Sequence, residues 1–215
     1  MQLGFHFDAW RCTGCKTCVM ACKDYRDNGT DIAFRQVYEY VGGTWEQGAG
    51  GLWQQGGPAG TPCFAWFVSV ACNHCARPVC VEVCPTGAMH KDADTGLVSV
   101  NARRCVGCGY CALSCPYHAP KVNRELGRSV KCDGCADRGA KGLPPVCVEA
   151  CPVRALDFGE IETLRQRYGT QADLAPLPNS ADTCPSLVIT PPKAAEVVPA
   201  EQLACGGVAN LREVV

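Results

Sequence analysis

The stretch "CPTGAMHKDADTGLVSVNARRC", residues 84–105, joins two cysteine-rich segments and carries the clearest local structural signals in the sequence. It predicts a short helical turn, a strand near 89–91 and a second strand near 97–100. Between the strands lies "DADTG", which is typical of a turn because Asp side chains bond the local backbone and Gly accepts positive φ. We therefore expect a helical turn followed by a β-hairpin, with a cysteine at each end.

Sixteen of the 19 cysteines in this 215-residue chain fall into four runs. The first and third runs are spaced C-x2-C-x2-C-x3-C, the second C-x2-C-x4-C-x3-C and the fourth C-x2-C-x11-C-x3-C. Proline follows each of the last three runs. These candidate metal ligands are Cys12, Cys15, Cys18, Cys22, Cys72, Cys75, Cys80, Cys84, Cys105, Cys108, Cys111, Cys115, Cys132, Cys135, Cys147 and Cys151.

Three explanations compete for so many cysteines. Disulfide frameworks belong mostly to short secreted chains, and no secretory signal is visible here. Zinc ribbons use paired C-x2-C segments and need neither the third cysteine of a tight run nor the proline behind it. Ferredoxins that hold [4Fe–4S] clusters use C-x2-C-x2-C-x3-C-P. The runs therefore favour iron–sulfur clusters.

The spacing has a physical reason. Three closely spaced thiolates let a tight loop surround a cluster, and we expect the fourth cysteine to have turned away and to start a helix. The fourth cysteine would then ligate the other cluster of a two-cluster unit. A following proline suits a first helical turn. Glycines within the runs let the backbone approach the cluster; these are Gly14, Gly107, Gly109 and Gly134.

The four runs contain an internal repeat. "PVCVEVCPTGA" at 78–88 and "PVCVEACPVRA" at 145–155 agree at eight of eleven positions. "RCTGCKTCVMAC" at 11–22 and "RCVGCGYCALSC" at 104–115 share the arginine, a glycine and all four cysteines. This alternation predicts a duplicated two-motif unit with four clusters.

The helix-plus-hairpin linker at 84–105 resembles that of bacterial two-cluster ferredoxins. We therefore expect an α+β fold of two ferredoxin-like units, built from short helices and β-hairpins. The outer unit would comprise residues 1–30 and 130–169, and the inner unit residues 72–129. Inserted strands and a loop would occupy 31–71, and an extended C-terminal arm 170–215.

The order of the runs is similar to that of the iron–sulfur B subunit of molybdopterin oxidoreductases of the dimethyl sulfoxide reductase family. The matching stretches span about residues 4–178; they are "CTGCKTCVMACKDYRD", "FRQVYEYVGGTW", "CNHC", "CPTGAMHK", "KCDGC", "VEACPVRALDFG" and "APLP". The resemblance implies a crossed ligand pairing: Cys12, Cys15 and Cys18 with Cys151; Cys132, Cys135 and Cys147 with Cys22; Cys72, Cys75 and Cys80 with Cys115; and Cys105, Cys108 and Cys111 with Cys84. With all four cysteines present in the third run, it predicts four [4Fe–4S] clusters.

The resemblance also implies an electron-transfer subunit that is not itself catalytic. It would relay electrons between a molybdopterin-containing catalytic subunit and a membrane anchor with its quinol pool, or a soluble donor. The reaction served would be the anaerobic reduction of an acceptor such as a sulfoxide. The subunit would lie peripheral to the cytoplasmic membrane, held there by its partners.

Two other functions remain open from the sequence. One is a ferredoxin-like carrier subunit of a hydrogenase or formate-linked complex, although the extra strands within 34–66 favour the first interpretation. The other is an interaction protein stabilised by zinc. The net charge of −1 argues against nucleic acid as a partner. The best apolar run, "FAWFVSVAC" at 64–72, is too short to cross a bilayer.

The segments outside the runs predict strands at 34–41 and 64–70, from their aromatic and β-branched content. The glycine-rich loop at 42–60 contains Trp45 and Trp53, which either dock on the catalytic partner or cover the protein's own clusters. A helix within 157–169 would place Ile161, Leu164 and Tyr168 on one face and end at Gly169.

Six cations close to the runs in sequence either offset the charge of the clusters or are solvated: Arg11, Lys16, Arg103, Arg104, Lys121 and Lys131. His74, within "CNHC", is better suited to a hydrogen bond near a cluster or a partner contact than to ligation. Cys63, Cys184 and Cys205 lack spacing partners and are expected to be free thiols, with a Cys184–Cys205 disulfide as the alternative.

Overall fold

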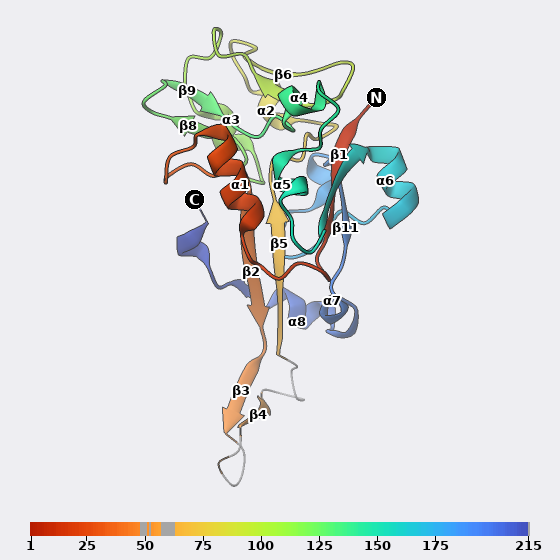
Figure 1. Ribbon diagram of the computed structural model, residues 1–215. Helices are drawn as coiled ribbons and strands as arrows, with labels where there is room; N and C mark the ends of the chain where they lie inside the picture. Colours follow the sequence, from red (N-terminus) through yellow and green to blue (C-terminus); the bar gives the residue numbers. More distant parts are fainter. Residues whose placement is uncertain (48–50, 52, 57–62, 215) are drawn as a thin grey trace.

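The computed structural model describes residues 1–47, 51, 53–56 and 63–214, with the backbone alone described at 45, 46 and 53–56. Figure 1 shows small sheets and short helices around a long central pair of strands, β2 (Gln36–Gly42) and β5 (Phe64–Val70). Two hairpins gather at one end of the molecule: β6 (Met89–Lys91) with β7 (Val98–Val100), and β8 (Lys121–Asn123) with β9 (Arg128–Val130). The helices α2 (Val79–Glu82) and α3 (Tyr110–Ser114) lie beside them. The β3–β4 pair lies at the opposite end. The fold is therefore mixed α+β.

One sheet has the strand order β10-β1-β11. Its central strand β1 (Leu3–Asp8) pairs antiparallel with β10 (Leu156–Glu160) and parallel with β11 (Leu187–Thr190). The central four residues of "LGFHFD" are all buried, so Phe5 and Phe7 are covered on one face of the strand and His6 on the other. Phe5 packs on Phe158, with ring centroids 4.7 Å apart. This sheet connects the start of the chain to two segments that lie far away in sequence.

The helix expected within 157–169 is confirmed as α6 (Ile161–Tyr168), which covers this sheet. Ile161 and Leu164 are buried against Val188 of β11, and Tyr168 packs at their edge. Gly169 ends the helix at φ 91°, and its N–H donates to the carbonyl of Arg165. The strand β10 directly before the helix was not predicted.

The strands expected at 34–41 and 64–70 are confirmed as β2 (Gln36–Gly42) and β5 (Phe64–Val70). They pair antiparallel along their whole length, and β12 (Gly207–Val208) adds to the free edge of β2. Tyr40, Phe64 and Trp66 pack between them with centroid distances of 5.1 to 6.1 Å. The pair thus forms a rigid ribbon through the core.

Beyond this ribbon, β3 (Thr44–Gln47) pairs with β4 (Trp53–Gly56). The predicted docking or covering role of Trp45 and Trp53 concerns side chains that lie outside the described part of the protein, as do residues 48–50, 52 and 57–62 of the loop. That role stays a prediction.

The hairpin predicted between the second and third runs is confirmed as β6 (Met89–Lys91) and β7 (Val98–Val100). In the turn between these two strands, the Asp92 carboxylate accepts a hydrogen bond from the Thr95 N–H at 2.8 Å. A second hairpin, β8 (Lys121–Asn123) and β9 (Arg128–Val130), follows the third run. The sequence analysis did not predict this hairpin.

The helices within the runs differ from the expectation that the fourth cysteine of each run starts a helix. The third cysteine of each run lies inside a helix: Cys18 in α1 (Thr17–Arg26), Cys80 in α2 (Val79–Glu82), Cys111 in α3 (Tyr110–Ser114) and Cys147 in α5 (Val146–Glu149). A further helix, α4 (Ala136–Gly139), follows Cys135.

The fourth cysteine therefore does not start a helix. In the second, third and fourth runs it follows the helix end, and Pro85, Pro116 and Pro152 lie in the turns beyond. The reason is that proline restricts the residue before it and cannot continue the hydrogen-bond ladder. The first run has Lys23 in place of proline, and α1 accordingly continues through Cys22 to Arg26.

The extended C-terminal arm predicted for 170–215 is wrong for the residues described there. The strand β11 is almost fully buried, and Val188 is 0% exposed. The segment continues through α7 (Lys193–Val197), α8 (Ala200–Ala204) and β12, with short 3-10 turns at Ser180–Asp182 and Leu211–Glu213. The apolar run "LVIT" pairs with β1 and is buried, whereas the surrounding prolines lie outside the strand. The other domain limits remain predictions.

Candidate functional site

The cysteines of the first run meet one cysteine of the fourth. Cys12, Cys15, Cys18 and Cys151 line one cavity, which we call site A. Burial, followed by the charges of the neighbouring thiols, raises the pKa of Cys12 to about 11. Such a pKa would keep the thiol protonated, so a bound cation is needed to stabilise the thiolate form.

A matching cavity lies between the second and third runs. Cys84, Cys105, Cys108 and Cys111 line it together with Met89 and Tyr110, and we call it site D. Gly107 sits at φ +69°, and a Cβ there would approach the Gly127 carbonyl oxygen to 2.5 Å. Glycine is thus needed where the loop passes close to the β8–β9 turn.

The remaining cysteines form two inner groups. Site B consists of Cys22, Cys132, Cys135 and Cys147, on and near the packed helices α1 and α5. Burial and the charges of Cys147 and Cys135 raise the pKa of Cys22 to about 12. Site C consists of Cys72, Cys75, Cys80 and Cys115, whose thiols act on one another. Burial and the charges of Cys72 and Cys115 raise the pKa of Cys80 to about 12.

The four sites follow one another through shared contacts. Cys18 of site A packs in one apolar cluster with Cys147 of site B. Cys132 of site B shares another cluster with Cys72 of site C. Cys80 of site C shares a third with Cys84 and Cys111 of site D. The order through the molecule is therefore A, B, C, D.

Exposure differs sharply between the ends and the middle of this row. Of the sixteen run cysteines, all of which the structure describes, only Cys15 of site A and Cys108 of site D are exposed. Every cysteine of site B is buried. The two end sites therefore reach the surface and the inner sites are sheltered.

Several sulfurs already accept hydrogen bonds from the backbone. The Met89 N–H donates to Cys84 Sγ at 3.3 Å and the Ser129 N–H to Cys105 Sγ at 3.3 Å. Gly134 donates to Cys132 Sγ at 3.4 Å and Ala155 to Cys151 Sγ at 3.3 Å. Such bonds stabilise a thiolate and tune a cluster that it holds.

The donor set fits iron–sulfur clusters. A [4Fe–4S] cluster takes four cysteine thiolates, and the cavities of sites A and D each bring together three cysteines of one run with the last cysteine of another. Within the described residues, no three Cys, His, Asp or Glu side chains converge as ligands of a single ion would. Which thiols ligate iron stays a prediction.

Two buried cations lie among the sites. Lys131 is 6% exposed, and its Nζ donates to the carbonyls of Cys132, at 2.7 Å, and of Val98. Burial alone would raise the pKa of the Cys72 thiol. The Lys131 ammonium and the His74 ring outweigh burial and lower this pKa to about 5. The second buried cation is Arg35, which the sequence analysis missed because it stands 13 residues after Cys22 inside a strand-like segment.

The other predicted cations lie further out. Arg11, Arg103 and Arg104 are exposed, and Lys16 and Lys121 are partly buried. Lys16 pairs with the Glu213 carboxylate, and Arg11 with Asp8 at 3.3 Å. Of the six cations that were singled out because they lie near the runs in sequence, only Lys131 is therefore buried.

His74 makes a hydrogen bond rather than closing a ligand set. Its side chain is fully buried, and Nδ1 accepts from the Val98 N–H at 2.9 Å. Its carbonyl accepts from the hydroxyl of Ser186 at 3.0 Å. Lys91, also missed by the sequence analysis, donates to the carbonyl of Cys75 at 2.9 Å. These bonds tie the loop of site C to the β6–β7 hairpin and to β11.

The cysteines outside the runs are free thiols. Cys184 and Cys205 are both exposed and do not form the alternative disulfide, and Cys63 is partly buried. None of the helices in the described residues combines the length and apolar character that crossing a membrane requires.

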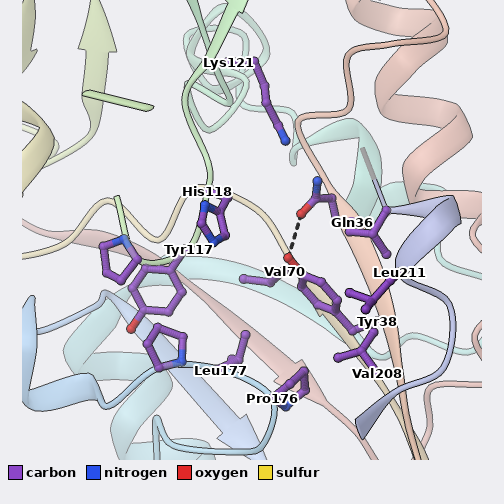
Figure 2. Close-up of a pocket in the computed structure, with 13 residues that line it drawn as sticks. Gln36, Tyr38, Val70, Tyr117, His118, Lys121, Pro176, Leu177, Val208 and Leu211 are labelled. Atoms are coloured by element: carbon purple, nitrogen blue, oxygen red, sulfur yellow. Dashed lines mark hydrogen bonds between the residues drawn. The ribbon is translucent and has the colours of Figure 1, made fainter. Parts of the chain in front are cut away.

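A surface groove lies beside site C (Figure 2). Tyr117 and His118, which follow Cys115, form one side, and Gln36 and Tyr38 of β2 form another. The Tyr38 hydroxyl donates to Gln36 Oε1 at 2.9 Å. The C-terminal segment closes the groove with Leu177, Val208, Leu211 and Val214. The segment after residue 170 thus helps to shape the surface near site C.

Comparison with known proteins adds independent information. A model described as a 4Fe-4S dicluster domain matches residues 63–161, and one described as a 4Fe-4S binding domain matches residues 3–24. The B subunit of the anaerobic dimethyl sulfoxide reductase of Haemophilus influenzae is 55% identical over 196 residues, which cover 91% of this sequence and 92% of that protein.

Two further relatives extend the comparison. The B subunit of the anaerobic dimethyl sulfoxide reductase of Escherichia coli K12 is 51% identical over 190 residues, covering 88% of this sequence and 89% of that protein. The thiosulfate reductase electron transfer subunit of Salmonella typhi is 39% identical over 169 residues, covering 78% of this sequence and 81% of that protein.

Proposed function

Because this protein belongs to the family of anaerobic dimethyl sulfoxide reductase B subunits, which are iron–sulfur electron-transfer subunits rather than catalytic ones, we propose that it carries four [4Fe–4S] clusters in sites A to D. It relays electrons between a molybdopterin-containing catalytic subunit and a membrane anchor that exchanges with the quinol pool. The terminal acceptor is a sulfoxide or a related small oxidant, in keeping with the names of its relatives.

The observation that carries this proposal is the row of sites A, B, C and D with exposed cysteines only at its two ends. When bound, each cluster supplies a one-electron carrier. A row that is sheltered in the middle and open at both ends can accept an electron at one end and release it at the other. Side reactions with solvent are limited to the end sites.

In this proposal the residues of the protein hold the clusters and set their reduction potentials. The cysteine thiolates hold the iron, with the crossed pairing that defines sites A to D. The N–H groups of Met89 and Ala155 donate to sulfurs and favour the more negative, reduced state. The buried Lys131 ammonium offsets negative charge between sites B and C.

The partners dock at the two exposed ends in this proposal. Beside site D, Val106, Tyr110 and Leu113 are large apolar side chains that are 65%, 56% and 83% exposed. Beside site A, Trp10 and Met20 are also exposed. Apolar and aromatic side chains that stay exposed are typical of interfaces. Through these partners the subunit lies peripheral to the cytoplasmic membrane.

The test is anaerobic purification from the native host with whatever co-purifies, followed by iron and molybdenum analysis. We expect about 16 to 20 iron atoms per molybdenum, from four clusters here and at most one in the partner. About 16 iron atoms without molybdenum would contradict the molybdopterin partner and point to a free carrier or a hydrogenase-type complex. A colourless protein that contains zinc would contradict the clusters themselves.

A further inference from the structure

Arg35 is a fully buried cation whose charge meets no carboxylate. Its residue is 2% exposed, and no ion pair involves it in the described part of the protein. The guanidinium lies over the Phe5 ring, with Cζ 4.9 Å from the ring centroid. A buried cation without an anionic partner is costly, so such an arrangement needs a source of negative charge.

Only one of its nitrogens is satisfied by the protein. Nη1 donates to the hydroxyl of Ser69 at 3.1 Å and to the Ser69 carbonyl at 3.3 Å. Nε and Nη2 are buried and find no hydrogen-bond partner among the described residues. Buried donors are almost always paired in folded proteins, and these two nitrogens therefore indicate an acceptor that the protein itself does not provide.

The surroundings of Arg35 identify that acceptor. The same Ser69 hydroxyl lies 3.4 Å from Cys18 Sγ of site A. Burial lowers the pKa of the guanidinium, but the thiolates of Cys147, Cys18, Cys132 and Cys22 outweigh burial and raise it. One of these cysteines belongs to site A and three to site B. The negative groups around Arg35 are thus those of two neighbouring sites.

We propose that Arg35 serves both site A and site B: it donates through Nε and Nη2 to their clusters and raises the reduction potential of both. The proposal rests on the cluster function above. A one-electron reduction adds one negative charge to a cluster, and a fixed cation beside it favours the reduced form. The electron comes from the neighbouring cluster, and no atom is transferred.

A shared cation has a specific consequence. Because the same charge acts on both clusters, it shifts their two potentials in the same direction and changes the difference between them little. Sites C and D should respond less, since the charges that act most strongly on Arg35 are those of cysteines in sites A and B. Arg35 directly precedes β2, whose register with β5 places Val37 opposite Ser69. The sheet therefore fixes both the guanidinium and its hydroxyl partner.

The experiment is a redox titration of the intact complex, followed by electron paramagnetic resonance, in three variants. Arg35→Met removes the charge, Arg35→Lys keeps it, and Arg11→Met removes an exposed arginine next to Cys12. Iron content is measured for each. In Arg35→Met we expect the reduced-to-oxidised ratio of two clusters to fall about tenfold at fixed potential, or ~59 mV for a one-electron couple.

The controls separate charge from shape. Arg35→Lys should restore most of the shift, and Arg11→Met should leave all four potentials unchanged. Four unchanged potentials in an Arg35→Met complex with full iron would overturn the inference, as would an equal shift in Arg35→Lys. Equal loss of iron in both Arg35 variants would also overturn it, because it would indicate a structural role only. A wild-type protein with far fewer than about 16 iron atoms would refute the four-cluster proposal instead.

Discussion

The hydroxyl of Ser69 lies 3.4 Å from the sulfur of Cys18, although the two residues come from different elements, β5 and α1. The relationship recurs in the other half of the sequence, where Ser129 Oγ of β9 lies 3.3 Å from Cys111 Sγ of α3. Cys18 and Cys111 are the third cysteines of the two runs with identical spacing. In both runs, therefore, a serine hydroxyl lies beside the sulfur of the third cysteine.

We predict that Ser69→Ala lowers the potential of the site A cluster. A hydrogen bond to a sulfur favours the more negative, reduced state. Its loss should cost about 1 kcal/mol, which corresponds to roughly 40 mV for a one-electron couple. A redox titration of the complex measures this shift. Ser129→Ala is the matched control, because it should shift a different cluster, that of site D, by a similar amount. A shift of the same cluster in both variants would contradict the assignment.

The crossed pairing predicts the effect of losing Cys22. Although Cys22 belongs to the first run, it lies in site B with Cys132, Cys135 and Cys147. Cys22→Ser should therefore damage the site B cluster and remove about four iron atoms, while the site A cluster remains. Iron analysis and spin counting measure the loss.

Two comparisons make this test specific. Cys12→Ser should remove the site A signal instead, and Cys205→Ser, at an exposed cysteine outside the runs, should remove none. If Cys22→Ser and Cys12→Ser abolished the same signal, the pairing would be wrong.

The C-terminal segment should be needed for stability. Val188 in β11 is 0% exposed and packs against Ile161 and Leu164. Removing its two methyl groups in Val188→Ala leaves a cavity and should cost about 2 kcal/mol, or an apparent Tm lower by roughly 5 °C. Val197→Ala on α7, where the side chain is 76% exposed, should change stability by less than ~0.5 kcal/mol. Equal effects would mean that β11 is not part of the core.

Stability should fall in mild acid because of His6. Its ring is buried, stacks on Tyr168 with a centroid distance of 3.6 Å, and lies 2.9 Å from the Thr190 hydroxyl through Nε2. Burial lowers the pKa of His6 below its usual value, against the opposing charges of Asp8 and Asp157. The unfolded protein then binds a proton more readily than the folded one. This contribution to stability is present above about pH 6.5 and decreases as the pH falls below it.

Thermal unfolding at pH 7.5 and pH 5.5 measures the effect. The loss of Tm between the two values should be smaller in His6→Gln than in the wild type, whatever the absolute stability of the variant. An identical loss in both would assign the acid sensitivity to other groups.

Much of the local structure could be read from the sequence. The β6–β7 hairpin, the strands β2 and β5 and the helix α6 follow from short patterns of apolar residues, turns and caps. The strands β1 and β11 escaped prediction, since their parallel pairing joins residues near 5 and 187 and no local signal marks it. The proline-rich composition after residue 170 concealed an apolar strand that buries only because β1 lies beside it.

For the site, the spacing of the sixteen cysteines was enough to indicate clusters, because the reach of neighbouring thiolates along one loop is a property of the local backbone. Which runs meet, which sulfurs are exposed and where the charge is buried depended on tertiary packing. Cys15 and Cys108 are exposed while their equivalents in site B are not, although the spacing is similar. Arg35 becomes a buried cation between two sites only because β2, β5 and β1 bring Ser69 and Phe5 against it, and burial of this kind is set by residues distant in the sequence.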